Sequence, residues 1–176
     1  MGCTVRKHIT ILCAVCLLLL CCGCQYRDFQ NTLTVPQAFF ATADITHGAF
    51  TCKAKLTFEE NGTTSFELLS PETLKTLTVT QTTDSCVFSF LGLEVKTPEA
   101  LLPDTAFAKL LYAALCGARD GTRCVKTVNG DIATYSGMTE AGDTYSLTQS
   151  REDGSLLSLT MDGQNFKVTF SEFQTP

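Results

Sequence analysis

The sequence predicts a mainly β (α+β) protein, built as a single curved antiparallel sheet that stays unclosed as a half-barrel, with one main helix on the concave face. Apolar and polar residues alternate in about nine or ten short segments, which is typical of strands with one buried face. Turn dipeptides such as Asn61-Gly62 and Asp162-Gly163 separate several of these segments, and short hairpins make neighbouring strands antiparallel. Only one segment repeats its apolar residues at helical spacing.

The first half of the predicted sheet begins near Phe39, where apolar and polar residues start to alternate. The alternation is strictest after His47-Gly48, which indicates a turn, and it continues up to Asn61-Gly62, where both residues tolerate a positive φ. Ser70-Pro71 then interrupts the pattern, because proline does not donate to a strand ladder. The strands expected in this half cover residues 50–58, 63–69, 77–82 and 85–91.

One amphipathic helix is predicted over residues 104–116, after a loop over residues 92–103 that carries two prolines. Asp104 is expected to cap the helix, because its carboxylate can accept hydrogen bonds from the first free N–H groups. Gly117 is expected to end the helix in the left-handed region. The apolar stripe of the helix consists of Phe107, Leu110, Leu111, Ala114 and Leu115.

The C-terminal third is predicted to be a run of antiparallel hairpins, because turn dipeptides fall between its short apolar segments. The last segment places Phe166, Val168 and Phe170 on one face and polar residues on the other. The strands expected here cover residues 122–128, 131–136, 144–149, 155–161 and 164–170.

The N-terminus has the pattern of a secretory signal. Arg6 and Lys7 lie in a short polar start, and residues 9–22 form an almost unbroken apolar run of 14 residues. A membrane-spanning helix needs about 20 apolar residues, so this run is too short to span a bilayer. Myristoylation at Gly2 is disfavoured, because Arg6 stands where that pattern needs Ser or Thr.

The end of this signal resembles a bacterial lipobox, in which an apolar stretch is followed by a small residue and a cysteine. Such signals are cut just before the cysteine, whose thiol carries diacylglycerol. Gly23-Cys24 fits best, although Cys21 stands where a lipobox usually has Leu; a cut before Cys22 and a plain secretory signal are the alternatives. We therefore expect a signal peptide over residues 1–23, a lipidated tether over 24–35 and one domain over 36–176.

Lipid on Cys24 would hold the protein on the extracytoplasmic face of the cell membrane. Each buried CH₂ group contributes about 0.8 kcal/mol, and one acyl chain alone binds a membrane only marginally. A diacylglyceryl group brings two chains, such as palmitate, so the attachment is expected to be lasting.

The charge of the predicted mature chain excludes nucleic acid as a partner. Without Arg6 and Lys7, 11 basic residues stand against 18 acidic ones, a net charge of −7. A phosphate backbone is bound by a positive surface, which such a chain does not predict. The 153 residues from Cys24 onward suit one domain with one core.

Four cysteines follow the lipobox, and they allow two states. In an exported protein they can form disulfides, for example Cys116 with Cys124 and Cys52 with Cys86. Free buried thiols fit the sequence equally well. No pair has the spacing of a zinc or thioredoxin-like site, so no metal is expected.

Residues suited to catalysis are scarce. His47 is the one histidine after the signal, and it lies in a predicted turn, although a Ser–His–Asp or Cys–His site would have to use it. Glu59-Glu60 at a strand end is expected to be solvated, unlike a glycosidase pair, and no glycine-rich phosphate loop is present. The sequence predicts a protein that is not an enzyme and that uses no cofactor.

The order of these motifs resembles the LolA-like lipoproteins of clostridial Gram-positive bacteria. The residues that carry the resemblance are the lipobox, Leu69-Ser70-Pro71-Glu72-Thr73-Leu74, Gly92-Leu93-Glu94-Val95, the proline-flanked helix and Val168-Thr169-Phe170-Ser171-Glu172-Phe173. The resemblance implies an unclosed, strongly curved antiparallel sheet with helix on its concave side. It also implies several roles, since relatives include lipoprotein carriers, lipid-binding lipoproteins and a spore-germination lipoprotein.

Two functions follow as expectations. The first is a concave groove that binds lipid or another apolar ligand; the alternative is a regulatory lipoprotein that docks an envelope or cell-wall protein through a sheet edge or the convex face. The groove requires an open concave face, whereas the predicted helix and the loop over residues 92–103 could also plug that face. The residues expected to line the groove are Phe50, Phe58, Phe66, Phe88, Phe90, Phe107, Phe166 and Phe170.

Overall fold

A computed structural model describes residues 34–121 and 123–176. These residues belong to one compact unit. The predicted signal peptide and Cys24 lie outside the described residues. Within the described ranges, no helix is long and apolar enough to cross a membrane.

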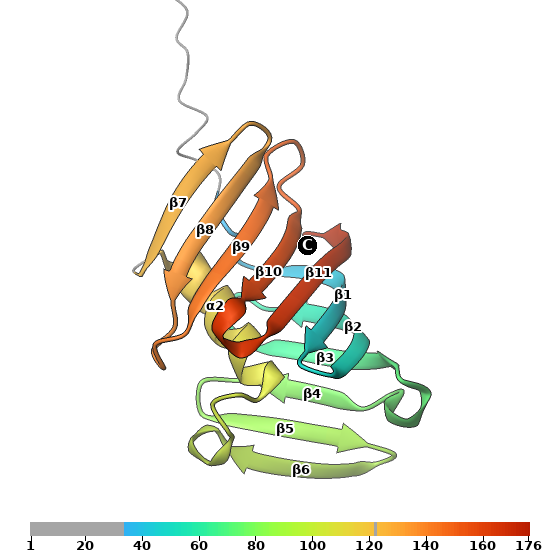
Figure 1. Cartoon of the computed structure of the whole chain (residues 1–176). Helices are drawn as coiled ribbons and strands as arrows, with labels where there is room; N and C mark the ends of the chain where they lie inside the picture. The colour runs from blue at the N-terminus through green and yellow to red at the C-terminus, as the bar shows by residue number, and fades with distance from the viewer. Residues whose placement is uncertain (1–33, 122) are drawn as a thin grey trace, which may run out of the picture. The chain divides into compact units, whose positions relative to one another are not determined.

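The described chain forms one unclosed antiparallel sheet of eleven strands, in the order β6-β5-β4-β3-β2-β1-β11-β10-β9-β8-β7 (Figure 1). Strands β1 to β6 form one meander and β7 to β11 form another, and the pairing of β1 with β11 joins them into one sheet. Strands β6 and β7 are therefore the two edges of the sheet. The predicted fold class is confirmed. The strands are β1 (Phe39–His47), β2 (Phe50–Phe58), β3 (Thr64–Ser70), β4 (Thr78–Gln81), β5 (Ser85–Phe90), β6 (Leu93–Pro98), β7 (Cys124–Asn129), β8 (Ile132–Met138), β9 (Thr144–Ser150), β10 (Leu156–Met161) and β11 (Phe166–Gln174).

Alternation along the strands places one face of the sheet in the core. In β2, Ala54 and Leu56 are buried while Lys53 and Lys55, which alternate with them, are exposed, as the sequence predicts. The predicted turn after His47 joins β1 to β2, and Gly48 takes φ +59 there, which a side chain rarely adopts. The first described residues also contact the domain: Val35 is buried, and the Gln149 side chain donates to the carbonyl of Thr34 at 3.3 Å.

The main helix, α2 (Phe107–Asp120), begins and ends later than predicted. Asp104 does not cap it; Ala106 is the N-cap residue, and the Asp104 carboxylate instead accepts a hydrogen bond from Lys109 Nζ at 2.8 Å. Gly117 does not end it either. The helix runs on to Gly121, which takes φ +68 as the left-handed cap.

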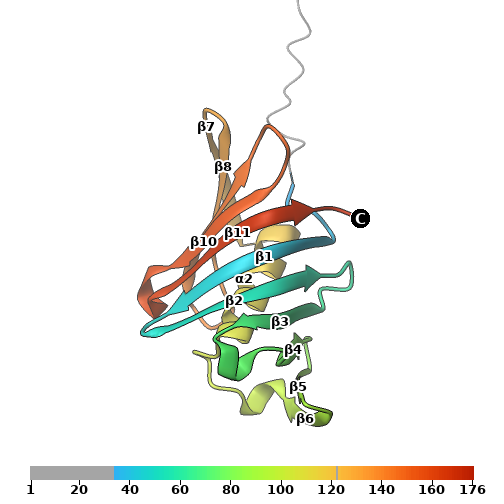
Figure 2. The same cartoon turned by 90° about the vertical axis from the view of Figure 1, so that its right-hand side faces the viewer.

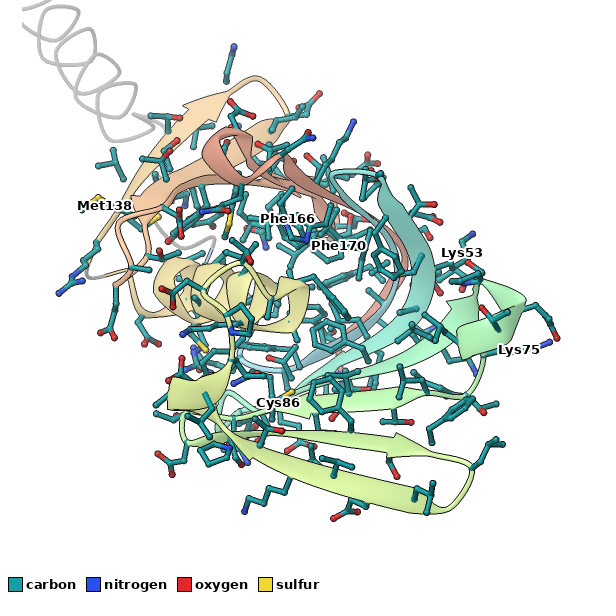
Figure 3. All side chains as sticks on the ribbon, turned by 60° about the horizontal axis from the view of Figure 1, so that its bottom comes forward. Lys53, Lys75, Cys86, Met138, Phe166 and Phe170 are labelled. Carbon is teal, nitrogen blue, oxygen red and sulfur yellow. The ribbon has the colours of Figure 1, made fainter. Side chains whose placement is uncertain are left out.

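Helix α2 lies on the concave side of the sheet, as predicted. Figure 2 shows it behind β1 to β3, and Figure 3 shows it inside the curve, on the side where Phe166 and Phe170 lie. It contacts β4, β8 and β9. Leu111 and Leu115 are fully buried, and burial of each such side chain contributes about 1.5–3 kcal/mol.

The prediction of a loop over residues 92–103 was wrong. Residues Leu93–Pro98 form the edge strand β6, Glu99–Leu101 form the short 3-10 helix η3, and residues 102–106 connect η3 to α2. Leu93, Val95 and Thr97 alternate with charged residues, which satisfies strand periodicity. Therefore Leu93–Pro98 extend the sheet, whereas Leu102, in the connection to α2, packs against the core. Two other 3-10 helices, η2 (Glu72–Leu74) and η4 (Asp162–Gln164), lie at strand connections.

Candidate functional site

The eight phenylalanines predicted to line a groove fall into two groups. Phe58, Phe66, Phe166 and Phe170 are buried between the sheet and α2, so they are core residues in this structure. The other four are only partly buried. Phe50, Phe88 and Phe107 pack at the margin of the core, and Phe90 lies farther along β5.

Phe107 closes the core at the start of α2. Its ring centroid lies 5.7 Å from that of Phe66 in an edge-on arrangement and 6.2 Å from that of Phe50. Such aromatic pairs stabilise the fold by about 0.5–1.5 kcal/mol beyond the contribution of the apolar area that they bury. The start of the helix is thereby fixed over β2 and β3.

The concave face continues past the helix onto β5 and β6, where it is exposed. Val79 of β4 is buried in the core, and the register places Phe88 beside it and Val95 beside Phe88. Leu93 is likewise opposite Phe90, so these side chains share the core face of the sheet. Leu93 is 75% exposed and Val95 59% exposed. We call Phe88, Phe90, Leu91, Leu93 and Val95 the β5–β6 patch.

Leu91 carries this apolar surface to the tip of the hairpin. It is 81% exposed and takes φ +52, followed by Gly92 at φ +81. A two-residue hairpin turn of this kind prefers Asn-Gly, because a side chain such as Leu is strained at positive φ. Leu91 is therefore unfavourable in two ways: its backbone is strained at positive φ, and its apolar side chain is exposed to water. Leu101 of η3, beyond the opposite end of β6, is also exposed.

A second feature is a cavity of about 700 Å³ on the side of α2 that faces away from the sheet. Lys109 lies in its wall and pairs with Glu99 at 2.7 Å and with Asp104 at 2.8 Å, so its charge is compensated. These two hydrogen-bonded carboxylates raise the pKa of Lys109. The lining is mixed. Apolar residues such as Leu110 and Met138 lie beside many charged ones, and these charges suit an apolar ligand less well than the β5–β6 patch does: they belong to Glu99, Asp104, Lys109, Asp120, Arg123, Glu140 and Asp143.

None of the four described cysteines has the surroundings of a nucleophile. Burial raises the pKa of Cys52 and of Cys86 to about 11 and also raises that of Cys116 and Cys124. His47 lies at the end of β1 with its ring against the edge of Phe166, at 5.8 Å between centroids. Across residues 34–121 and 123–176, no group of three His, Cys, Asp or Glu side chains could hold a metal ion.

The same four cysteines are free thiols in the structure. Cys52 and Cys86 lie on β2 and β5, with β3 and β4 between them, so about three strand spacings of 4.8 Å separate their backbones. A disulfide needs Cα atoms within about 7 Å, which this arrangement does not allow. Cys116 packs near Arg119 and Tyr112, whereas Cys124 packs near Tyr145.

The sequence prediction named Phe88 and Phe90 but missed Leu91, Leu93 and Val95. Leu93 and Val95 were missed because the two prolines that follow them suggested a loop, whereas Leu91 was placed at the end of the predicted strand over residues 85–91. The alternation of Leu93, Val95 and Thr97 with charged residues was the signal that could have identified them.

No family model matches the sequence, and no curated protein matches it. Among solved structures, an uncharacterised conserved protein from Thermus thermophilus is similar with a TM-score of 0.46 and 12% identity, over 84% of this chain and 82% of that one. A LolA superfamily protein from Nitrosomonas europaea is similar with a TM-score of 0.44 and 8% identity, over 85% and 91%. Because both TM-scores fall below 0.5, the proposals below rest on the residues of this chain.

Proposed function

We propose that this protein is a non-catalytic lipoprotein, anchored through Cys24 on the extracytoplasmic face of the cell membrane, that binds a lipid or another apolar ligand on the β5–β6 patch. The observation that carries the proposal is the exposure of adjacent large apolar side chains on the core face of β5 and β6. Contiguous exposed apolar surface is costly in a monomer and marks interaction sites.

The position of the patch favours a ligand that lies along the sheet. It continues the core surface from Val79, and it lies on the side of β4 away from β8 and β9, the other strands with which α2 has its main contacts. An acyl chain placed there would cover Leu93 and Val95 and join the apolar side chains of the core. Removal of apolar area from water contributes about 25 cal/mol per Å², so even partial cover favours binding.

The binding test uses the full chain and a fluorescent fatty acid, with Val95→Asp as the variant. A carboxylate at position 95 would be desolvated by a bound acyl chain, so we expect affinity to fall about tenfold or more. Val125→Asp is the matched control, because Val125 is a similarly exposed valine on the opposite edge strand, β7. Equal binding by Val95→Asp and Val125→Asp would contradict a ligand site on the patch.

The anchor is tested separately. Chains carrying Cys24→Ala should lose incorporation of labelled palmitate and should leave the membrane fraction, because the attachment needs the thiol. Cys22→Ala tests the alternative lipidation site and should leave both properties intact. Continued membrane association of the Cys24→Ala chain would contradict the anchor without bearing on the patch.

A further inference from the structure

The edge strand β6 has a charge pattern that is complementary to itself. It pairs with β5 on one side only, so the backbone N–H and C=O groups on its other side are open to another strand. Glu94 and Lys96 lie on the convex face, opposite Ser89 and Val87. Both are exposed, and neither has an ion-pair partner within the described ranges 34–121 and 123–176.

We propose that two copies of this chain associate through their β6 strands, antiparallel and centred on Val95. A two-fold axis perpendicular to the sheet brings the edges together and keeps each residue on its own face. In this register Glu94 of each copy lies opposite Lys96 of the other. Val95 lies opposite its own equivalent.

The charges select this register over its neighbours. A shift that centres the pair on Glu94 opposes two glutamates, and a shift that centres it on Lys96 opposes two lysines. Like charges directly opposite are destabilising, whereas opposite charges stabilise a strand pair. Pro98, which has no N–H to donate, falls opposite Gly92 at the end of the pairing, where it costs little.

The other edge of the sheet lacks this property. Strand β7 carries Lys126 as its single charged residue, so no two-fold register of β7 opposes unlike charges. A lysine alone discourages pairing at a sheet edge. A lysine two residues from a glutamate on the same face instead favours pairing of the strand with the same strand of a second copy, because unlike charges then lie opposite each other. The structure therefore assigns self-association to β6 and not to β7.

Association would join the two β5–β6 patches into one apolar surface, because Leu93 and Val95 of both copies share the concave face. A single pair of short strands buries less than the 1,200 Å² or so of a stable interface, so the contact should be weak in free solution. Two anchored copies in one membrane meet at a higher effective concentration. The raised effective concentration depends on the proposed anchor at Cys24, whereas the pairing of the β6 strands does not.

The first experiment is disulfide trapping in full-length chains. With Val95→Cys, the two introduced thiols meet across the axis at a Cα separation of about 4.5–5.5 Å, within disulfide range. We expect a cross-linked dimer of this chain from Val95→Cys under mild oxidation and none from the matched Val125→Cys. Equal trapping by both variants, or an adduct of Val95→Cys with a different protein, would overturn the proposal.

The second experiment reverses charges and measures co-purification of two differently tagged full-length copies. Glu94→Lys alone or Lys96→Glu alone opposes like charges at both contacts and should reduce co-purification about tenfold. The double variant, and a mixture of the two single variants, should restore it. Failure of both rescues would contradict the pairing. Because positions 94 and 96 lie on the convex face, these variants leave every side chain of the β5–β6 patch in place. Binding of fatty acid by a single copy should therefore persist in them, which separates this test from that of the patch.

Discussion

Tyr145 of β9 packs directly on the backbone of Gly137 in β8. A Cβ atom at position 137 would lie 2.8 Å from Cε1 of the Tyr145 ring and in contact with the phenol oxygen. The same phenol oxygen would lie 3.0 Å from a Cβ at Gly117 of α2. Tyr145 is buried, so its ring occupies the space between two glycines and brings the helix close to the sheet.

Gly137→Ala should therefore destabilise the protein by about 1–3 kcal/mol, because a buried ring must move to admit the methyl group. Gly117→Ala should lower the stability less, for two reasons. Alanine is about 1 kcal/mol more favourable than glycine inside a helix, and a Cβ at position 117 overlaps the Tyr145 ring less than one at position 137 does. Chemical denaturation of the variants measures both effects. Gly163→Ala, where nothing lies within 4 Å, is the control. Gly137→Ala and Gly163→Ala of equal stability would disprove the packing argument.

Arg119 joins the end of α2 to the β2–β3 hairpin. Its Nη1 donates to the carbonyl of Glu60 at 3.2 Å, and its guanidinium lies 5.2 Å from the centroid of the Phe58 ring. We expect Arg119→Ala to cost about 1–3 kcal/mol of unfolding free energy. Arg119→Lys should recover only part of it, because an ammonium does not reproduce the planar contact. Full recovery by lysine in a thermal or urea melt would show that charge alone matters.

Stability should fall as the pH rises from about 9 to about 11. Cys52 and Cys86 have pKa values of about 11 in the folded chain, above the 9.0 of an exposed thiol, because burial disfavours the thiolate. The unfolded chain therefore loses these protons first, which favours unfolding over that interval. Tyr135, whose pKa burial raises to about 12, acts in the same direction.

Urea midpoints at about pH 8 and about pH 10.5 measure this effect. The chain with Cys52→Ala and Cys86→Ala should start less stable at the lower pH, because each change opens a small cavity. Its further loss at the higher pH should be smaller than that of the unchanged chain. An equal loss in both chains would show that these thiols do not titrate on unfolding.

The sequence predicted the fold class well because periodicity and turn dipeptides are local. Alternation in β2 and the turn at Asn61-Gly62 are encoded within a few residues and survive folding. The end of α2 was mispredicted because it depends on a distant residue. Gly117 has a helix-ending sequence signal, but Tyr145 packs on it and the helix continues.

The candidate site was only half predicted, for a related reason. Aromatic residues identify an apolar face, so Phe88 and Phe90 were found, but the exposure of that face depends on how far α2 reaches across the sheet. Asp104 likewise had the sequence signal of a helix cap, whereas the position of Lys109 directs its carboxylate into an ion pair. Sequence periodicity does not encode such distances.

Photo-crosslinking of the full chain with a diazirine-bearing fatty acid tests the central claim most directly. If the β5–β6 patch binds acyl chains, peptide mapping should find adducts on Phe88, Phe90, Leu93 or Val95, and excess unlabelled fatty acid should compete them away. Adducts confined to the lining of the cavity over α2, such as Tyr112 or Met138, would contradict the account. So would the absence of any competed adduct at saturating probe.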